Sequence, residues 1–364
     1  MARKRPCKPS REMDALIEKK VKEALASAAA AATVATAAAH AAIAACTPSP
    51  PAKPLLKWIG GKTQILDDVL RLFPTKIHNY YEPFIGGASV LISLLTAVAT
   101  GAITLTGTVY ASDLNANLIH FYRTVQHDPD ALIGEVNVLQ AEFARCGEGA
   151  ANRTPTTLEE AITSPESYYY WSRSRFNALK GDMRHSPLAA ALFLFLNKTC
   201  FRGMYREGPR GFNVPFGNYK NPGIVDEAQL HSLSVLLKKV VFTATPFEGA
   251  LAGTMKGDFV YLDPPYAPET DTSFVSYTSE GFAEKDHAAL FALCHEMNKK
   301  GVAWAMSNAH VTRVMEAFPA PAYVTRVISC RRAIHSTNPG SKANEVLITN
   351  RMGDEEGEGK EEGR

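Results

Sequence analysis

The chain has 364 residues, of which 46% are hydrophobic and 21% are charged, and these proportions are ordinary for a globular protein. Its formal net charge of only +2 excludes a uniformly basic nucleic-acid-binding chain, so any basic binding surface must be local. The six cysteines are scattered, without a CxxC pair or a His cluster at metal-ligand spacing. We therefore expect free thiols, no metal, and an intracellular reducing compartment such as cytoplasm, nucleoid or nucleus.

The two ends of the chain differ in composition from the rest. Residues 1–52 begin with a basic stretch, continue as a run dominated by Ala and end in a Pro-rich segment. Ala favours helix, but a run with few large apolar side chains has little to pack against, which predicts a flexible extension or a lone helix. Its uncharged part, residues 26–46, is too weakly apolar for stable insertion, so no membrane association is expected. Residues 352–364 predict a disordered acidic tail.

Between these ends, short apolar runs alternate with longer runs of helical spacing. Such alternation predicts an α/β fold with a doubly wound, mostly parallel sheet. The expected strands are residues 80–84, 109–113, 239–243, 259–262 and 302–306, followed by a terminal strand pair at 324–329 and 345–349. The expected helices are residues 88–97, 115–126 and 284–299.

The pattern changes between residues 130 and 222, where helices and a long polar loop replace the alternation. We interpret residues 130–222 as an insertion between strands of the sheet. The core of the protein then consists of residues 53–129 and 223–351.

The strongest functional motif is Asp263-Pro264-Pro265-Tyr266, directly after the apolar run at residues 259–262. Open parallel sheets bind ligands beyond the carboxyl ends of their strands. There the Asp263 carboxylate and the Pro264 carbonyl can accept both N–H bonds of a planar aromatic amine, while Tyr266 stacks on its ring. Accepting both protons localises the lone pair of the amine nitrogen, which can then attack an electrophile held in line. The alternative is an ordinary Asp-Pro turn after a strand.

Three further motifs lie earlier in the core. Glu82-Pro83-Phe84-Ile85-Gly86-Gly87 places two glycines between a strand and a helix, where the backbone can approach a ligand closely. Asp113 ends the next strand, where an acid can accept hydrogen bonds from two ribose hydroxyls. Lys57-Trp58-Ile59-Gly60-Gly61-Lys62 is typical of a small-ligand or phosphate clamp. A tight turn, a solvated acid and a helix entry are the respective structural alternatives.

Residues 197–220 form a polar loop in which Arg and Lys alternate with aromatic side chains. This mixture suits contact with phosphates, reading of base edges and wedging between bases. A β-hairpin on an ordinary protein surface is the alternative. Because the whole chain is close to neutral, the cations gathered in this loop favour nucleic acid as the partner.

In this order, the motifs resemble those of the Dam-type, alpha-class DNA adenine N6-methyltransferases. Residues 57–62 resemble the KWxGGK motif of that family, residues 82–90 its EPFxGxGSV motif, and residues 113–115 its DxN step. Residues 197–222 are similar to its NRxxxNGLxR…FNVPFGxYKxP hairpin, and residues 263–266 to its DPPY motif. The resemblance implies a Rossmann-like S-adenosylmethionine-dependent methyltransferase fold, with residues 53–129 and 223–351 as the catalytic domain and residues 130–222 as an inserted DNA-recognition domain.

The resemblance also implies roles for single residues. The catalytic motif, Asp263, Pro264, Pro265 and Tyr266, would hold an adenine flipped out of duplex DNA. The residues implied to bind S-adenosylmethionine are Trp58, Lys62, Phe84, Gly86, Asp113, Phe247 and Asp263. The residues implied to contact DNA are Lys57, Phe201, Arg202, Met204, Arg206 and Arg210. Lys57 and Arg206 match positions that read bases around the target, which indicates GATC or a related short palindrome.

The chain departs from the family pattern at two positions. Ala88 replaces the second motif glycine, and its added methyl group is expected to be tolerated. Arg202 replaces the Asn of NGL, which leaves the intercalation detail and the sequence preference open. Two other functions also stay open: a methyltransferase acting on amines of RNA or another nucleic acid, and a catalytically inactive DNA-binding module. A cognate restriction endonuclease is a candidate partner beside double-stranded DNA, and the sequence does not predict an oligomeric state.

Overall fold

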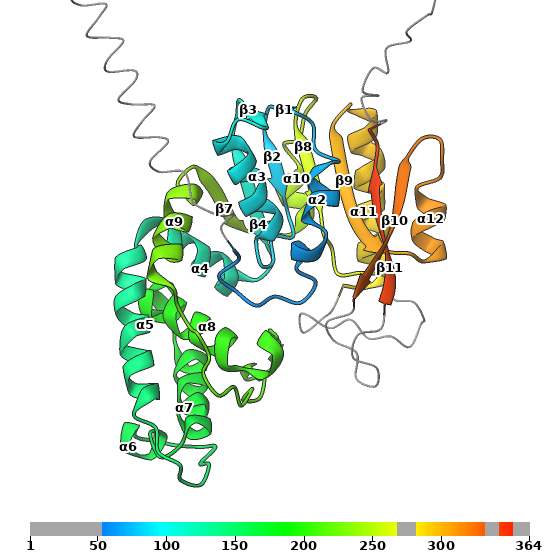
Figure 1. Cartoon of the computed structure of the whole chain (residues 1–364). Coiled ribbons are helices and arrows are strands. Elements are labelled where there is room, and N and C mark those ends of the chain that lie inside the picture. Colours follow the sequence, from blue (N-terminus) through cyan, green and yellow to red (C-terminus); the bar gives the residue numbers. More distant parts are fainter. Residues whose placement is uncertain (1–52, 268–281, 332–341, 352–364) are drawn as a thin grey trace, which may run out of the picture. The chain divides into compact units, whose positions relative to one another are not determined.

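The computed structural model describes residues 53–267, 282–331 and 342–351. The expected N-terminal extension and acidic tail lie outside these ranges. A seven-stranded sheet organises the described residues (Figure 1). Its strands are β2 (Tyr80–Glu82), β4 (Val109–Asp113), β7 (Val240–Ala244), β8 (Phe259–Leu262), β9 (Ala303–Ala309), β10 (Val324–Arg331) and β11 (Lys342–Thr349).

The strand order of the sheet is β10-β11-β9-β8-β2-β4-β7. Strands β9, β8, β2, β4 and β7 run parallel to one another, whereas β11 pairs antiparallel with both β9 and β10. The expected mostly parallel sheet and terminal strand pair are therefore confirmed. From β2 the chain moves outward through β4 to β7 and then returns to β8 on the other side of β2. The order thus reverses between β2 and β8, where sheets of this kind bind ligands.

Burial on both faces explains why the strands are apolar runs in the sequence. All four residues of β8 are buried. Phe259 and Tyr261 belong to one apolar core cluster, while Val260 and Leu262 belong to another. Because side chains alternate across a strand, the sheet has a core on each face, as expected for parallel strands covered by helices.

Helices connect the strands and cover the sheet. Asn115 caps the helix after β4, because its side chain accepts a hydrogen bond from the Leu118 amide. That helix therefore begins directly after Asp113, the last residue of β4. The elements around the sheet are η1 (Lys62–Gln64), α2 (Leu66–Leu70), α3 (Ser89–Ala99), α4 (Ala116–His127), α10 (Phe247–Leu251), α11 (Glu284–Lys299) and α12 (Thr312–Ala317), with short strands β1 (Lys76–Ile77) and β3 (Thr104–Leu105).

A helical segment lies between β4 and β7 in the sequence. Figure 1 shows α5, α7 and α8 gathered below the β7 side of the sheet, away from β9, β10 and β11. Helices α7 and α8 each begin with Pro at the first position after a capping serine, Ser164 or Ser186. The helices of this segment are α5 (Pro129–Ala144), α6 (Leu158–Ala161), α7 (Pro165–Ala178), η2 (Gly181–His185), α8 (Pro187–Thr199) and α9 (Glu227–Leu237).

The expected hairpin at residues 197–220 is shorter in the structure than the sequence indicates. Its strands β5 (Glu207–Gly208) and β6 (Gly211–Phe212) pair antiparallel, and farther from the turn the pairing continues only as an isolated antiparallel bridge between Cys200 and Phe216. The segment begins as the end of α8 and then forms the 3-10 turn η3 (Phe201–Gly203), inside which Arg202 has a left-handed φ of 56°. Pro209 and Pro215 lack an amide hydrogen for strand pairing, which limits the ladder.

Within residues 53–267, 282–331 and 342–351, no helix is long and apolar enough to cross a lipid bilayer. Three cysteines lie where their side chains are described, and each is a free thiol: Cys146, Cys200 and Cys294.

Candidate active site

Three acidic side chains lie at the carboxyl ends of three neighbouring strands. Glu82 ends β2, Asp113 ends β4, and Asp263 follows β8 directly. Because β4, β2 and β8 are adjacent and parallel, these ends share one edge of the sheet at its switch point. The sheet topology therefore brings together acids that are far apart in the sequence.

Lys62 and Asp263 form a buried ion pair at this edge. The Lys62 Nζ lies 2.7 Å from Asp263 Oδ1, and the two side chains are 5% and 18% exposed. Apart from Lys62, Asp263 Oδ1 has no polar partner within the described ranges. Burial raises the pKa of Asp263 to about 6, although the Lys62 ammonium pulls it down. Asp263 is thus a charged acceptor near neutral pH, in a place where an uncompensated carboxylate would be protonated.

The rest of the 263–266 motif forms a corner held at both ends. Pro264 is buried, and the Ala267 amide donates to the side-chain oxygen of buried Asn308 at 3.1 Å. The Tyr266 ring lies 4.9 Å from the Lys62 ammonium, and its hydroxyl donates to Glu345 Oε2 at 2.7 Å. The motif therefore presents an acid and an aromatic ring side by side, as the sequence predicts.

Glu82 is a buried acid next to this pair that the sequence analysis assigned no role. It is 2% exposed, and the Tyr80 hydroxyl donates to its Oε2 at 2.7 Å. Burial raises the pKa of Glu82 to about 8, helped by the negative charge of Asp263 and opposed by the Tyr80 hydrogen bond. At neutral pH, Glu82 is therefore mostly protonated and adds little negative charge beside Asp263.

Asp113 contacts the glycine-rich turn that follows β2. Its Oδ2 accepts a hydrogen bond from the Gly86 amide at 3.2 Å, and its Oδ1 accepts one from the Asn115 amide at 3.0 Å. Burial raises the pKa of Asp113 to about 6 in spite of these backbone bonds. The Leu114 amide also favours the charged form, and because a carboxylate has about four lone-pair sites, acceptor capacity remains for a hydroxyl of a ligand.

Trp58 closes the glycine-rich turn from the other side. A Cβ on Gly86 would lie 2.8 Å from Trp58 Cδ1, and one on Gly87 would lie 3.0 Å from Trp58 Cβ. Gly86 also has a φ of +46°, so the absence of a side chain is needed for both conformation and space. The next residue but one, Ala88, also has positive φ, at 59°, and is fully buried. The sequence indicated a tolerated methyl group there, but not this left-handed backbone.

Three phenylalanines form an apolar wall beside these polar groups. The ring centroids of Phe84 and Phe247 lie 5.6 Å apart, and Phe282 lies 5.9 Å from each. Leu114, directly after Asp113, is 61% exposed. Half-buried Phe84 and exposed Leu114 offer apolar surface that suits a planar ligand. The structure thus places Phe84 and Phe247, two of the residues expected to bind S-adenosylmethionine, against each other.

Lys57 is attached to the 197–220 segment rather than to the sheet. The side-chain amide of Asn197 bonds both the Lys57 amide, at 2.9 Å, and the Lys57 carbonyl, at 2.8 Å. The Lys57 Nζ lies 4.1 Å above the Tyr219 ring. Lys57 and Lys62 therefore lie at the two ends of one short segment that joins the 197–220 segment to the Asp263 site.

Most of the predicted DNA contacts are exposed. The amide of Arg202 donates to the Tyr219 hydroxyl, and its guanidinium lies 5.2 Å from the Phe201 ring, which is 43% exposed. The Arg206 Nε donates to Asn213 Oδ1 at 2.6 Å, and this contact orients the Arg206 guanidinium. Arg210 is exposed at the turn between β5 and β6. These cations, together with an exposed aromatic ring, form a surface suited to nucleic acid.

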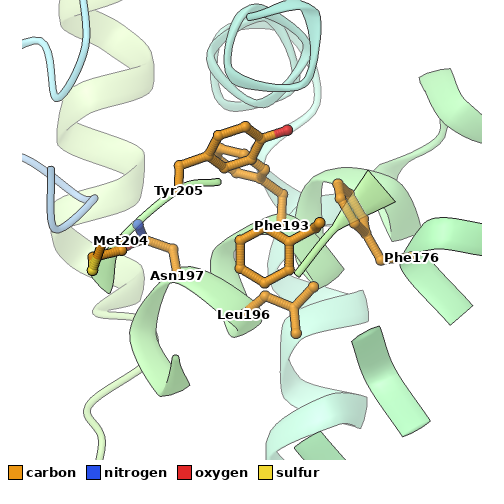
Figure 2. A pocket seen from close by; sticks show the side chains of 7 residues that line it. Phe176, Phe193, Leu196, Asn197, Met204 and Tyr205 are labelled. Carbon is orange, nitrogen blue, oxygen red and sulfur yellow. The ribbon is translucent and has the colours of Figure 1, made fainter. Parts of the chain in front are cut away.

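Met204 differs from these residues because it is partly packed into the protein. It borders a small, mainly apolar pocket under the 197–220 segment (Figure 2). None of the acids of the Asp263 site lines this pocket. Its lining is Phe176, Phe193, Leu196, Asn197, Met204, Tyr205 and Phe212.

Tyr205 links this segment to the glycine-rich turn. Its ring stacks on Trp58 with centroids 5.9 Å apart, and its hydroxyl accepts a hydrogen bond from Asn117 at 3.0 Å and donates to Glu207. Tyr205, Asn308 and Glu345 were not predicted from the sequence. Tyr205 occupies a variable position of the 197–222 motif, while Asn308 and Glu345 lie outside every motif and contact partners far away in the sequence.

Comparison with known proteins shows the family of the chain. The family model of D12 class N6 adenine-specific DNA methyltransferases matches residues 58–329. The type II methyltransferase M.MjaIII of Methanocaldococcus jannaschii is 36% identical over 291 residues, which cover 77% of this chain and 93% of that protein. The type II methyltransferase M1.LlaDCHI of Lactococcus lactis subsp. cremoris is 30% identical over 302 residues, 82% of this chain and 95% of that protein. The DNA adenine methylase of Escherichia coli K12 is 29% identical over 305 residues, 83% of this chain and 96% of that protein.

The family match covers most of the sequence and includes all five motifs or their greater part. It confirms the resemblance, and with it the expectation of an adenine-specific DNA-modifying enzyme. The chain belongs to the D12 class of N6 adenine-specific DNA methyltransferases.

Proposed function

We propose that this protein transfers the methyl group of S-adenosylmethionine to the N6 amine of an adenine flipped out of duplex DNA. The observation that carries the proposal is the Lys62–Asp263 ion pair at the end of β8, next to the Tyr266 ring. It provides a charged hydrogen-bond acceptor and a stacking surface in a buried corner. A stacked base in a duplex cannot enter such a corner, so the adenine must leave the helix.

The residues around Asp113 fit S-adenosylmethionine. Asp113 keeps free acceptor sites for ribose hydroxyls, and the Gly86 backbone approaches Trp58 so closely that no side chain fits between them. Phe84, Phe247 and exposed Leu114 supply apolar surface for an adenine ring. In this assignment Trp58, Lys62, Phe84, Gly86, Asp113, Phe247 and Asp263 surround the cofactor.

The chain itself contributes acceptors and position to the reaction. When bound, S-adenosylmethionine supplies an electrophilic methyl group on a sulfonium. Asp263 and the Pro264 carbonyl accept the two N–H bonds of the target amine, so its lone pair points away from the ring plane and forms the new N–C bond. In the transfer the methyl–sulfur bond would break with its electron pair left on sulfur, and one of the two amine protons would pass to water, leaving a neutral methylated amine. Holding the reactants in line accounts for most of the expected rate.

We assign residues 53–129 and 223–351 to catalysis and residues 130–222 to DNA recognition. Lys57 and Arg206 are the proposed base readers, while Phe201, Arg202, Met204 and Arg210 contact the duplex nearby. GATC or a related short palindrome is the proposed site. A restriction endonuclease of the same site is the proposed partner, supported by two relatives that are named type II methyltransferases.

The experiment that tests this function is incubation of the purified chain with labelled S-adenosylmethionine and unmethylated genomic DNA, followed by sequencing of methylated bases. Methyl groups at N6 of adenine within one short site are the expected result. Parallel reactions with RNA separate the closest alternative, because label on RNA alone contradicts a DNA substrate. Transfer to neither nucleic acid, with DNA binding intact, would indicate a catalytically inactive binding module.

A further inference from the structure

Glu345 reaches the Asp263 site from a part of the sheet that contributes no other site residue. It lies on β11, where it pairs with Ala309 of the neighbouring antiparallel strand β9. Its Oε2 accepts the hydrogen bond of the Tyr266 hydroxyl at 2.7 Å. Both side chains are half-buried, and a hydrogen bond from a hydroxyl to a carboxylate is stronger than one between neutral groups.

The negative charge of Glu345 disfavours the ionised form of Asp263. This charge raises the pKa of Asp263, and it also contributes to the raised pKa of Tyr266. Like charges disfavour each other's ionised forms, so a second acid near Asp263 opposes the charge that the reaction needs. A glutamate that served only the strand would be better placed elsewhere. Its contact with Tyr266 is the compensating interaction.

The Tyr266 hydroxyl has no part in stacking, because a phenylalanine ring offers the same face. The ring turns about two side-chain torsions, and the torsion next to an aromatic ring is broad. Lys62 lies 4.9 Å from the centre of the ring, and Glu345 holds its far end. The hydroxyl lies on the axis of that torsion, so Glu345 fixes the direction in which the ring points, while Lys62 above the face restrains rotation of the ring plane about this axis.

We infer that Glu345 is a positioning residue that fixes the Tyr266 ring in the orientation needed to stack on the target base. The inference rests on the proposed function, because it assumes that a planar base enters beside Asp263. It assigns a role to β11, a strand outside the parallel part of the sheet.

The test compares five variants with wild type: Glu345→Ala, Glu345→Gln, Tyr266→Phe, the double variant Tyr266→Phe/Glu345→Ala, and Asn344→Ala. Asn344 is the matched control, since it is the exposed neighbour of Glu345 on the same strand. The measurements are kcat with saturating duplex and cofactor, the Kd for S-adenosylmethionine, the melting temperature, and the fluorescence of 2-aminopurine placed at the target position.

We expect Glu345→Ala to lower kcat about tenfold, as the loss of one hydrogen bond to a charged group predicts. Glu345→Gln keeps an acceptor and should recover most of that loss. Tyr266→Phe should lower kcat as much as Glu345→Ala does, and the double variant no further, because both remove the same bond. The Kd for S-adenosylmethionine should equal the wild-type value in every variant. Asn344→Ala should also keep the wild-type kcat. The 2-aminopurine probe should be brighter in the Glu345→Ala complex, since a misplaced ring stacks and quenches poorly.

Two results would overturn the inference while leaving the proposed function in place. One is a wild-type kcat for Glu345→Ala. The other is a loss in Glu345→Ala that adds in full to the Tyr266→Phe loss, which would mean that Glu345 acts on some other group. If wild type transfers no methyl group to duplex DNA, the proposed function fails first and the inference fails with it.

Discussion

Lys62 and Asp263 meet at 2.7 Å although the whole helical segment between β4 and β7 separates them in the sequence. The pair is buried, so its value is electrostatic rather than a gain in stability: replacing such pairs by apolar groups is often neutral. What Lys62 does is oppose the desolvation that raises the pKa of Asp263, which stays at about 6. The carboxylate therefore remains ionised near neutral pH and can accept an N–H bond.

Removal of the Asp263 charge should slow the reaction strongly and leave DNA binding intact. We expect Asp263→Asn to lower kcat by about 10²–10³, because a group placed for the developing transition state is lost while the size of the side chain is kept. Duplex binding, measured by fluorescence anisotropy, should stay near wild type, since the exposed cations of residues 197–220 are unchanged. Asp182→Asn is the control, an exposed acid in η2. A wild-type rate for Asp263→Asn would exclude the carboxylate from the chemistry.

Activity should depend on pH through the same carboxylate. Because burial raises the pKa of Asp263 to about 6, the side chain gains a proton as pH falls through that value and can no longer accept from the amine with a full charge. We expect kcat to fall on the acid side of about pH 6 and to be level above it. The measurement is a pH profile at saturating cofactor, since Asp113 also has a pKa of about 6 and would weaken cofactor binding in the same range.

Lys62→Met tests whether the Lys62–Asp263 pair sets the pH at which kcat falls. Without the ammonium, nothing among the described side chains lowers the pKa of Asp263. The fall of kcat with decreasing pH should therefore begin at a higher pH than in wild type. If kcat falls at the same pH in Lys62→Met as in wild type, a group other than Asp263 controls the pH dependence.

The glycine-rich turn offers a test of fit. Gly86→Ala would place a methyl group 2.8 Å from Trp58 Cδ1 at a residue with positive φ. We expect a loss of about 1–3 kcal/mol in the free energy of unfolding, as for other overpacked sites, together with weaker cofactor binding. Gly134→Ala is the control, because that glycine lies inside α5 with open space around it, and alanine there should stabilise the helix by about 0.5–1 kcal/mol. Equal stability of the two variants would contradict the close packing of Trp58.

The sequence predicted the sheet well because its strands are buried on both faces. The runs at residues 109–113 and 259–262 match β4 and β8 residue for residue, since β4 ends at an acid and β8 ends directly before one. It failed where conformation depends on distant partners. Nothing local indicates that Arg202 turns left-handed against Tyr219, or that only four residues of the long loop pair as strands.

The site was predictable only where its residues lie in motifs. The sequence places Lys62, Asp113 and Asp263 in short patterns at strand and helix ends, and the fold then brings them to one edge. Glu345 and Asn308 lie outside any motif and enter the site only through the pairing of β9 and β11. Their contribution depends on strand register, which a single sequence does not reveal.

Arg206 should control which base is read beside the target adenine. Its guanidinium is exposed and is oriented by Asn213, so a bidentate contact with a guanine edge costs little further ordering. We expect Arg206→Ala to lose about 1–3 kcal/mol of discrimination at a single position of the site, with kcat on the preferred site changed less than the preference itself. Methylation of a library of duplexes that differ at each position measures this directly. Arg71→Ala, which removes an exposed arginine paired with Asp68 on α2, should leave the preference unchanged. If Arg206→Ala instead weakens methylation of all duplexes equally, the residue contacts the phosphate backbone and the base reader lies elsewhere.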